Sequence, residues 1–310
     1  MIEVRNLTKV YGATTAVHDL SFTVRPGVVT GFLGPNGAGK STTMRAIVGL
    51  HRQTRGEVLV GGRRYEASPA PLHEVGALLD ARAVHPHRTA RNHLLALAAT
   101  HGIGPDRVEE VLELVGLQAV ARRLVGGFSL GMSQRLGIAT ALLGDPRVVL
   151  LDEPVNGLDP EGIRWVRELL RTLADEGRTV LVSSHLMSEM AVTADHLVIL
   201  GRGRLLADLS MAEMTASVTP AVRVRTDRAD DLRRLLPGAE VTADAGDPGA
   251  LSVSGVTATE VARTALDHRI LLHELTPVHA SLEDAYLAMT RSDVEYQASP
   301  VTTSPRRAAA

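Results

Sequence analysis

Alternating and fully apolar runs open the chain and predict β-strands. They are Ile2–Leu7, Ala16–Val24 and Val28–Leu33, and Gly, Pro and Asn residues separate them. Residues 41–49 instead carry apolar side chains at helical spacing, and strand signals return at Gly56–Val60. The start of the chain therefore predicts several strands around one helix.

The middle of the chain alternates helical and strand patterns. Residues 89–143 are mainly helical, with Thr89 as the expected N-cap. Two apolar strands follow, VVLLDEP at 148–154 and TVLVSSH at 179–185, with an amphipathic helix at 161–177 between them. The stripe expected to be buried on that helix comprises Ile163, Val166, Leu169, Leu170 and Leu173. Because strands joined by helices pair in parallel, this pattern predicts an α/β sheet.

A second unit is expected to begin near residue 218. Its strand patterns lie at 221–226, 239–243, 250–255 and 270–275, and its helical patterns at 228–236 and 257–268. The order β-α-β-β-α-β is the split βαβ, or ferredoxin-like, arrangement. A last helical pattern covers 281–290, and residues 292–310 have the Ser, Thr, Pro and Ala content typical of a disordered tail. We therefore divide the chain into 1–215, 216–291 and this tail.

Composition argues against several classes of protein. The 33 basic and 35 acidic side chains leave a net charge of −2, which argues against a nucleic-acid binder that depends on massed positive charge. The absence of cysteine excludes disulfides and thiolate metal sites. The N-terminus lacks the apolar core of a signal peptide, and no run approaches the ~18 apolar residues of a membrane helix. We expect a chain that acts on a membrane only through a partner.

The stretch GPNGAGKST predicts a phosphate-binding loop. It fits G-x-x-x-x-G-K-[ST] and lies between a predicted strand and a predicted helix, which is the context that this motif requires. Its glycines let backbone N–H groups approach phosphate oxygens, and the start of the helix adds its positive end. Lys40 would reach the β- and γ-phosphates where an arginine fork has no room, and Ser41 would offer its hydroxyl to Mg²⁺. The expected nucleotide-binding residues are Gly34, Pro35, Asn36, Gly37, Ala38, Gly39, Lys40, Ser41 and Thr42.

A phosphate loop alone leaves ATPase, GTPase and kinase open. A GTPase reads guanine with an N-K-x-D stretch, and the chain has two lysines, Lys9 and Lys40. Lys40 belongs to the phosphate loop and Lys9 lies in TKVY, so the sequence contains no such stretch. This absence argues against a GTPase.

Acidic residues end the first of the two buried strands. In open parallel sheets ligands bind beyond the carboxyl ends of the strands, so Asp152 and Glu153 are expected beside the phosphate loop. Asp152 would hold Mg²⁺, directly or through water, and Glu153 would polarise the attacking water as general base. His185 follows the next buried strand and would contact the γ-phosphate or orient the water.

Five motifs, which follow one another along the chain as they do in that family, resemble those of the ATP-binding subunits of ABC transporters. GPNGAGKST looks like the Walker A loop, VVLLDEP the Walker B strand, NGLD at 156–159 the D-loop and SSH the switch histidine. FSLGMSQRLGIATALLGDP is similar to the signature motif and the helix after it, which other phosphate-loop ATPases lack. The ending PVHASLEDAYLAMT is similar to subunits that serve ABC-2-type exporters.

The resemblance implies a fold and a mechanism. The fold would be an α/β phosphate-loop ATPase core with an antiparallel β subdomain and a helical subdomain at about 72–144, joined to the small C-terminal α+β domain. Two subunits would face head to tail, so that each ATP lies between the phosphate loop of one and Ser129 and Gly131 of the other. ATP binding would close this homodimer and hydrolysis would reopen it. Tyr11 would stack on adenine, and Asp159 would contribute from the D-loop.

The same resemblance implies partners and a location. ATP and Mg²⁺ would be the cofactors of an ATPase coupled to transport. An integral-membrane permease on a separate chain would receive the motion of the helical subdomain. The chain would therefore work as a peripheral protein at the cytoplasmic face of the cell membrane, with no nucleic acid as partner.

Two residues depart from the family pattern. Leu130 replaces a glycine of the signature and lowers the tolerance of the backbone for unusual torsions. Asp80 stands where the family usually has glutamine, and an ionised aspartate only accepts hydrogen bonds, although it can still meet Mg²⁺ through water. These departures keep open a nucleotide-gated regulatory module with little turnover. A soluble ABC-type ATPase that remodels ribosomes or DNA is a further alternative, against which the single phosphate loop and the lack of sustained heptads argue.

Overall fold

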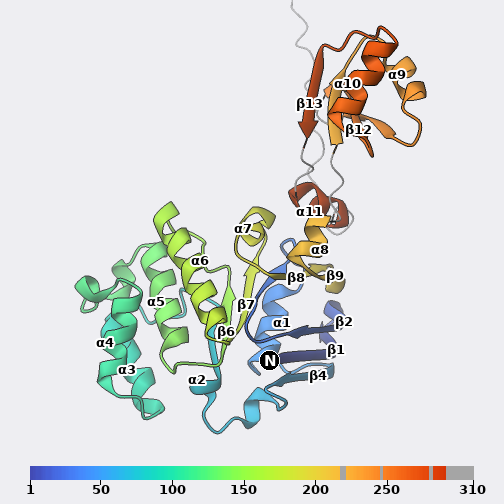
Figure 1. The fold of residues 1–310 in the computed structure, drawn as a ribbon. Helices are drawn as coiled ribbons and strands as arrows, with labels where there is room; N and C mark the ends of the chain where they lie inside the picture. The colour runs from blue at the N-terminus through green and yellow to red at the C-terminus, as the bar shows by residue number, and fades with distance from the viewer. Residues whose placement is uncertain (217–220, 245–246, 279–281, 291–310) are drawn as a thin grey trace, which may run out of the picture. The chain divides into compact units, whose positions relative to one another are not determined.

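A computed structural model describes residues 1–216, 221–244, 247–278 and 282–290. They form two compact units, Met1–Asp208 with Thr290, and Leu209–Met289 (Figure 1). The expected disordered tail at 292–310 lies outside the described residues. Each unit has its own buried core and is described by itself below.

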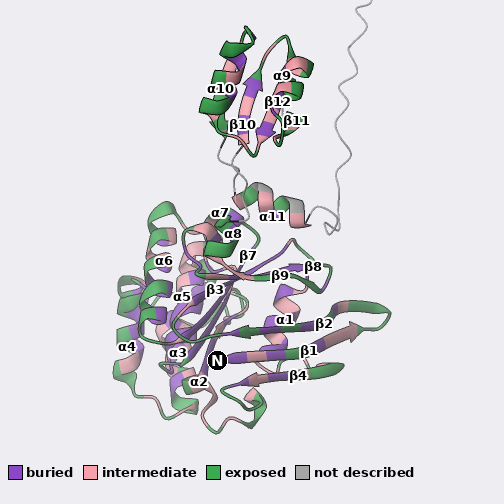
Figure 2. Ribbon diagram, turned by 45° about the vertical axis from the view of Figure 1, so that its right-hand side comes forward, coloured by how far each residue is buried: buried purple, intermediate pink, exposed green. Residues whose placement is uncertain are grey.

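A six-stranded sheet forms the centre of the first unit. Its order is β5-β6-β7-β3-β8-β9, and β5, β6, β7, β3 and β8 pair in parallel. The strands β3 and β7 are buried along their whole length, as their continuous apolar sequences require (Figure 2). The bounds are β3 (Val29–Leu33), β5 (Val75–Leu78), β6 (Val148–Asp152), β7 (Thr179–Ser184), β8 (His196–Gly201) and β9 (Arg204–Ser210).

A second, antiparallel sheet of order β2-β1-β4 packs on the same core. It comprises β1 (Ile2–Tyr11), β2 (Thr14–Val24) and β4 (Arg55–Val60). Ile2 pairs with Val24 on one side and Val60 on the other, so the apolar positions of all three strands share one face. Phe22 of this sheet lies 5.3 Å from Phe32 of β3, between ring centroids. The helix α1 (Lys40–Ile47) packs in the same cluster through Met44. The antiparallel β subdomain is confirmed.

Helices α3 (Ala90–Thr100), α4 (Pro105–Leu114) and α5 (Leu130–Leu142) gather on one side of the central sheet, away from the antiparallel sheet (Figure 1). Thr89 caps α3 as expected, since its hydroxyl accepts a hydrogen bond of 3.2 Å from the Asn92 N–H. The backbone of α5 lies directly on β5, because a Cβ placed on Gly76 would stand 1.8 Å from the Ala141 carbonyl oxygen. A Cβ on Gly137 would likewise stand 2.4 Å from Leu78 Cδ1, and since Leu78 pairs with Leu151, these contacts hold α5 along β5 as far as the end of β6.

The expected amphipathic helix is α6 (Pro160–Asp175). Its stripe is buried at Val166, Leu169, Leu170 and Leu173, whereas Ile163 is only half-buried. The sequence patterns did not reveal β5, β8, β9 or the short helices α2 (Pro71–Glu74), α7 (Met187–Ala191) and α8 (Met211–Ala216). Elements of four to seven residues carry little periodicity, so some of this length, such as β3, β6 and β7, are recognised from the sequence and others are not.

The second unit has the ferredoxin-like arrangement that its sequence predicts. Its antiparallel sheet has the order β11-β12-β10-β13, and the helices α9 and α10 pack on the core of that sheet. The bounds are β10 (Ala221–Arg225), α9 (Ala229–Leu235), β11 (Glu240–Asp244), β12 (Asp247–Ser254), α10 (Ala258–Asp267) and β13 (Glu274–Val278), followed by α11 (Leu282–Thr290).

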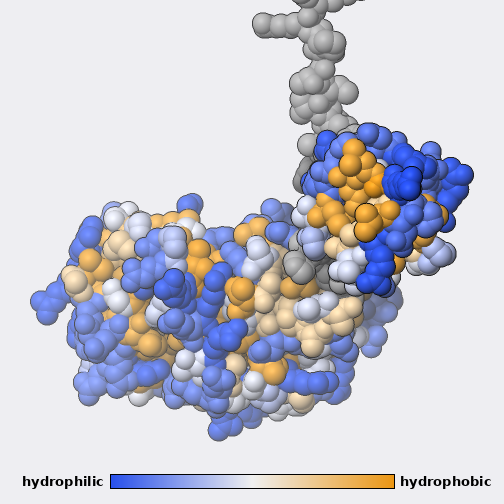
Figure 3. All heavy atoms as spheres, turned by 45° about the horizontal axis from the view of Figure 1, so that its top comes forward, coloured by the Kyte–Doolittle hydropathy of each residue, from blue (hydrophilic) through white to orange (hydrophobic). Residues whose placement is uncertain are grey.

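The strand expected at 270–275 begins only at Glu274, so that prediction was wrong. Ile270 is buried, and its N–H bonds the Ala265 carbonyl at 2.8 Å, which ends α10 instead of starting a strand. Hydrophobic side chains gather on one face of this unit (Figure 3). Leu266 and Leu271, in α10 and after it, are 78% and 67% exposed. Leu266 lies in a helix as expected, whereas the exposure of Leu271 shows that an apolar stretch of sequence need not form a buried strand.

Candidate nucleotide-binding site

The phosphate loop joins the end of β3 to the start of α1 through glycines that have no room for a side chain. A Cβ on Gly34 would lie 2.6 Å from the Leu200 carbonyl oxygen, and one on Gly39 would lie 2.8 Å from the Ala16 carbonyl oxygen. Gly39 also has φ +97°, a conformation that other residues rarely adopt. The loop is therefore held close to its neighbours, and within it the Ala38 N–H donates to the Pro35 carbonyl at 3.1 Å.

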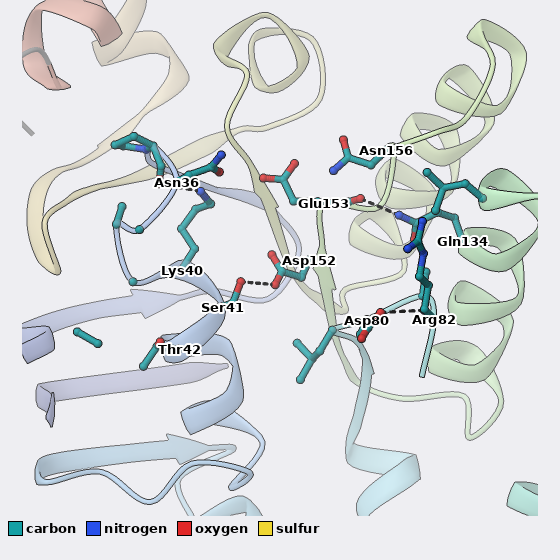
Figure 4. Close-up of a pocket in the computed structure, with 18 of the residues that line it drawn as sticks. Asn36, Lys40, Ser41, Thr42, Asp80, Arg82, Gln134, Asp152, Glu153 and Asn156 are labelled. Carbon is teal, nitrogen blue, oxygen red and sulfur yellow. Dashed lines mark hydrogen bonds between the residues drawn. The ribbon is translucent and has the colours of Figure 1, made fainter. Parts of the chain in front are cut away.

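This loop borders a cavity of about 680 Å³. Among the residues that line it are most of those predicted for the nucleotide, together with Asn156 of the D-loop motif and two residues that were not predicted, Arg82 and Gln134 (Figure 4). The predicted residues on the lining are Tyr11, Pro35, Asn36, Gly37, Ala38, Gly39, Lys40, Ser41, Thr42, Asp80, Asp152 and Glu153. The tertiary fold thus brings three separate motifs to one cavity.

Lys40 is 7% exposed and folds back over its own loop. Its Nζ donates hydrogen bonds to the carbonyl oxygens of Gly34 at 2.5 Å and Pro35 at 3.3 Å. Burial lowers the pKa of Lys40 below its usual 10.5, while the carboxylates of Glu153 and Asp152 act in the opposite direction. An anion in the cavity would stabilise this ammonium better than the two carbonyls do.

Ser41 and Asp152 meet across the two motifs. The Ser41 hydroxyl donates to Asp152 Oδ2 at 2.6 Å, and the Ser183 hydroxyl donates to Asp152 Oδ1. This set of a hydroxyl and a carboxylate consists of hard oxygen donors, which fit Mg²⁺. Asp80 lines the same cavity, but its Oδ1 accepts the Arg82 N–H at 2.8 Å within its own loop.

Glu153 is held at three points. Its N–H donates to Ser183 Oγ at 2.9 Å, its carbonyl accepts from Gln134 Nε2 at 3.2 Å, and its carboxylate oxygens both lie 3.0 Å from His185 Nδ1. Its φ is +49°, which is unfavourable for a residue with a side chain. Such strain persists only where the surroundings impose it, and it is a common property of functional residues. The pairing of Glu153 with His185 agrees with the roles expected of them.

The signature residues lie apart from this cavity, except for Leu130. Ser129 caps α5, where its Oγ accepts the Met132 N–H at 3.2 Å, and a Cβ on Gly131 would lie 3.0 Å from the Gly157 carbonyl oxygen. Asp159 caps α6 in the same way, through a 2.9 Å hydrogen bond from the Gly162 N–H. The residues that line the cavity beside Lys40 do not include Ser129, Gly131 or Asp159.

Tyr11 also lines the cavity and is 42% exposed. Its hydroxyl is 2.6 Å from His51 Nδ1, and Lys9 Nζ stands 4.7 Å from the centroid of its ring. These contacts hold the ring in place on the cavity lining. Gln134 stands two positions after Met132 of the signature, in the first turns of α5, and is a lining residue that the predicted site did not include.

Comparison with known proteins agrees with this geometry. Residues 17–156 match the family model described as "ABC transporter", and residues 220–283 match one described as "Domain of unknown function (DUF8746)". The chain is 35% identical to the uncharacterized ABC transporter ATP-binding protein YhcH of Bacillus subtilis over 94% of this chain and 96% of that protein. It is 43% identical to the bacitracin transport ATP-binding protein BcrA of Bacillus licheniformis over 67% of this chain and 69% of that protein.

The chain belongs to the ATP-binding proteins of the ABC transporters. The structure of an ATP-binding subunit of an ABC transporter matches with a TM-score of 0.64 and 28% identity, over 70% of this chain and 92% of that one. Membership in the ABC family confirms the resemblance drawn from the motifs and the α/β phosphate-loop fold. It equally confirms ATP with Mg²⁺ as the cofactors and ATP hydrolysis as the activity.

Proposed function

We propose that this ABC protein is the ATPase subunit of a membrane exporter and that the cavity beside Lys40 is its ATP site. The observation that carries the proposal is the 2.6 Å contact between Ser41 Oγ and Asp152 Oδ2. It joins the phosphate loop to the acidic end of β6 at the point where Mg²⁺ bridges a nucleotide in enzymes that transfer phosphoryl groups.

The predicted site residues then have the following roles. Lys40 would exchange its two carbonyl partners for β- and γ-phosphate oxygens, and Ser41 and Asp152 would hold Mg²⁺. Glu153 takes a proton from the attacking water, and His185 orients its carboxylate or contacts the γ-phosphate. Asp80 would support Mg²⁺ through water, and the ring of Tyr11 would stack on adenine.

The placement of the signature supports a head-to-tail homodimer. Ser129 and Gly131 open α5 and do not line the cavity of their own chain, although Leu130 between them does, and this supports a contact with the γ-phosphate on a partner subunit. Asp159 would reach the same interface from the D-loop. A bacterial ABC transporter cassette with 25% identity to this chain and a TM-score of 0.63 is described as dimeric. ATP would therefore close the dimer, and hydrolysis would reopen it.

Relatives support export as the process that this cycle drives. They are named for the transport of bacitracin and of lantibiotics. Among the described residues there is no helix with the length and apolarity needed to span a membrane. We therefore place the chain at the cytoplasmic face of the cell membrane, bound to a separate permease through a helical subdomain at about 72–144. The division into 1–215, 216–291 and a disordered tail stays a prediction.

Affinity purification from detergent-solubilised membranes tests the exporter. We expect the tagged chain to carry a polytopic membrane protein in stoichiometric amount, and the complex to hydrolyse ATP. Recovery from the soluble fraction with ribosomes or DNA would instead favour a remodelling ATPase. A stable complex that binds ATP without steady-state turnover would favour a regulatory module. Either of these results would contradict the proposal.

A further inference from the structure

Gln134 lies in the nucleotide cavity with an unusual distribution of hydrogen bonds. The residue is only 6% exposed, and its Nε2 donates to the Glu153 carbonyl at 3.2 Å. Oε1 is buried and has no partner among the described residues. The opposite orientation of this amide would place two oxygens against each other, so the contact with Glu153 determines which atom faces it.

The contact falls on the residue with the most constrained backbone in the site. Glu153 has φ +49°, and Ser183 Oγ holds its N–H while Gln134 holds its carbonyl. The direction of the Glu153 side chain depends on this conformation, because φ sets where Cβ points. Loss of one of the two backbone contacts frees the carboxylate to leave its place beside His185.

Gln134 also stands on the helix that presents the signature. Ser129 caps α5 and Gln134 follows five positions later, about 7.5 Å along a rigid helix. Figure 4 shows Gln134 reaching from α5 towards Glu153, with the Arg82 side chain running along the same helix. A displacement of Ser129 and Gly131 therefore moves the group that holds the Glu153 carbonyl.

We propose that Gln134 is a positioning residue that ties the signature helix to the backbone of Glu153. It rests on the proposed function, since the signature then grips the nucleotide of the partner subunit while Glu153 acts on the nucleotide of its own chain. Closure on one ATP thereby sets the geometry of the general base at the other. The free Oε1 is the acceptor that a water beside Glu153 would use.

The test compares full-length Gln134→Met and Gln134→Glu with wild type, using ATP and Mg²⁺. Methionine keeps the length and removes the donor, so we expect unchanged ATP affinity and a turnover lower by roughly 10- to 100-fold, as small misplacements of a reacting group produce. Gln118→Met, at an exposed glutamine of a short turn, is the matched control and should behave as wild type. Turnover of Gln134→Met within about twofold of wild type would overturn the proposal, since a twofold change is well under one kcal/mol.

Gln134→Glu provides the second readout. A buried carboxyl among acidic neighbours has a raised pKa, and only its neutral form donates to the Glu153 carbonyl. We therefore expect the ratio of its turnover to that of wild type to rise as pH falls. A ratio that does not change with pH would overturn the proposal even if Gln134→Met fails to fold. Failure of the proposed function looks different, because wild type with its membrane partner would then show no turnover.

Discussion

Gly157 lies against Leu130, the residue that replaces a signature glycine, and Gly157→Ala measures this contact. Gly157 has φ +76°, and a Cβ there would lie 2.3 Å from Leu130 Cδ2. The left-handed conformation costs about 1–2 kcal/mol for a residue with a Cβ. The overlap adds about 1 kcal/mol, at the low end for overpacking, because Leu130 is 41% exposed and can move. We expect Gly157→Ala to lower the free energy of unfolding by about 2–3 kcal/mol.

Gly177→Ala is the matched control. Gly177 has φ +82°, and a Cβ added there would have no other atom within 4 Å, so the substitution costs only the left-handed conformation, about 1–2 kcal/mol. In a Leu130→Ala background the overlapping Cγ and Cδ atoms are gone. Only the Leu130 Cβ then remains, 3.1 Å from the added Cβ, so Gly157→Ala should cost little more than Gly177→Ala, which gives a coupling of about 1 kcal/mol between Leu130 and Gly157.

Urea unfolding followed by tryptophan fluorescence suits this cycle. Trp165 is the only tryptophan and lies on α6 of the first unit, beside Arg135 at 4.8 Å from its ring centroid. Its signal therefore reports on the unit that contains the contact. Equal costs for Gly157→Ala in both backgrounds, matching the cost of Gly177→Ala, would refute the idea that Leu130 packs on the D-loop.

Three further predictions concern the nucleotide site and the second unit. Because burial lowers the pKa of Lys40, the unfolded chain binds more protons than the folded chain just below pH 10.5. The free energy of unfolding of wild type should therefore rise towards that pH, relative to that of Lys40→Met. The Lys40→Met variant should also lose ATP binding. A stability difference that stays constant with pH in urea titrations would contradict this. Glu153→Gln should keep ATP affinity and accumulate a closed dimer in size-exclusion chromatography, and full hydrolysis by this variant would refute the base assignment. Thr257→Ala removes a capping box in which Thr257 Oγ1 accepts a hydrogen bond of 3.2 Å from the Glu260 N–H. The substitution should lower the free energy of unfolding of the second unit by about 0.5–2 kcal/mol. Calorimetry measures this change, and a thermal transition equal to that of wild type would contradict the prediction.

Sequence patterns determined the elements whose signals are local. The apolar runs of β3, β6 and β7, the Thr89 cap and the glycine loop before Lys40 all follow from spacing within a few residues. The order of the elements in the second unit likewise predicts its ferredoxin-like sheet. These features are readable because period, turn residues and caps act over short distances along the chain.

Only the tertiary structure decided which of these local features meet. Ser41 and Asp152 are 111 positions apart, and Gln134 reaches the Glu153 carbonyl from a different element. No periodicity encodes such contacts, because they depend on how α5 lies against β5 and on where parallel strands end. The late start of β13 also depends on tertiary packing, because the Ile270 side chain is buried in the core of the second unit and the strand begins only at Glu274. Local residue types therefore determined the chemistry available to this protein, and long-range packing decided where that chemistry is assembled.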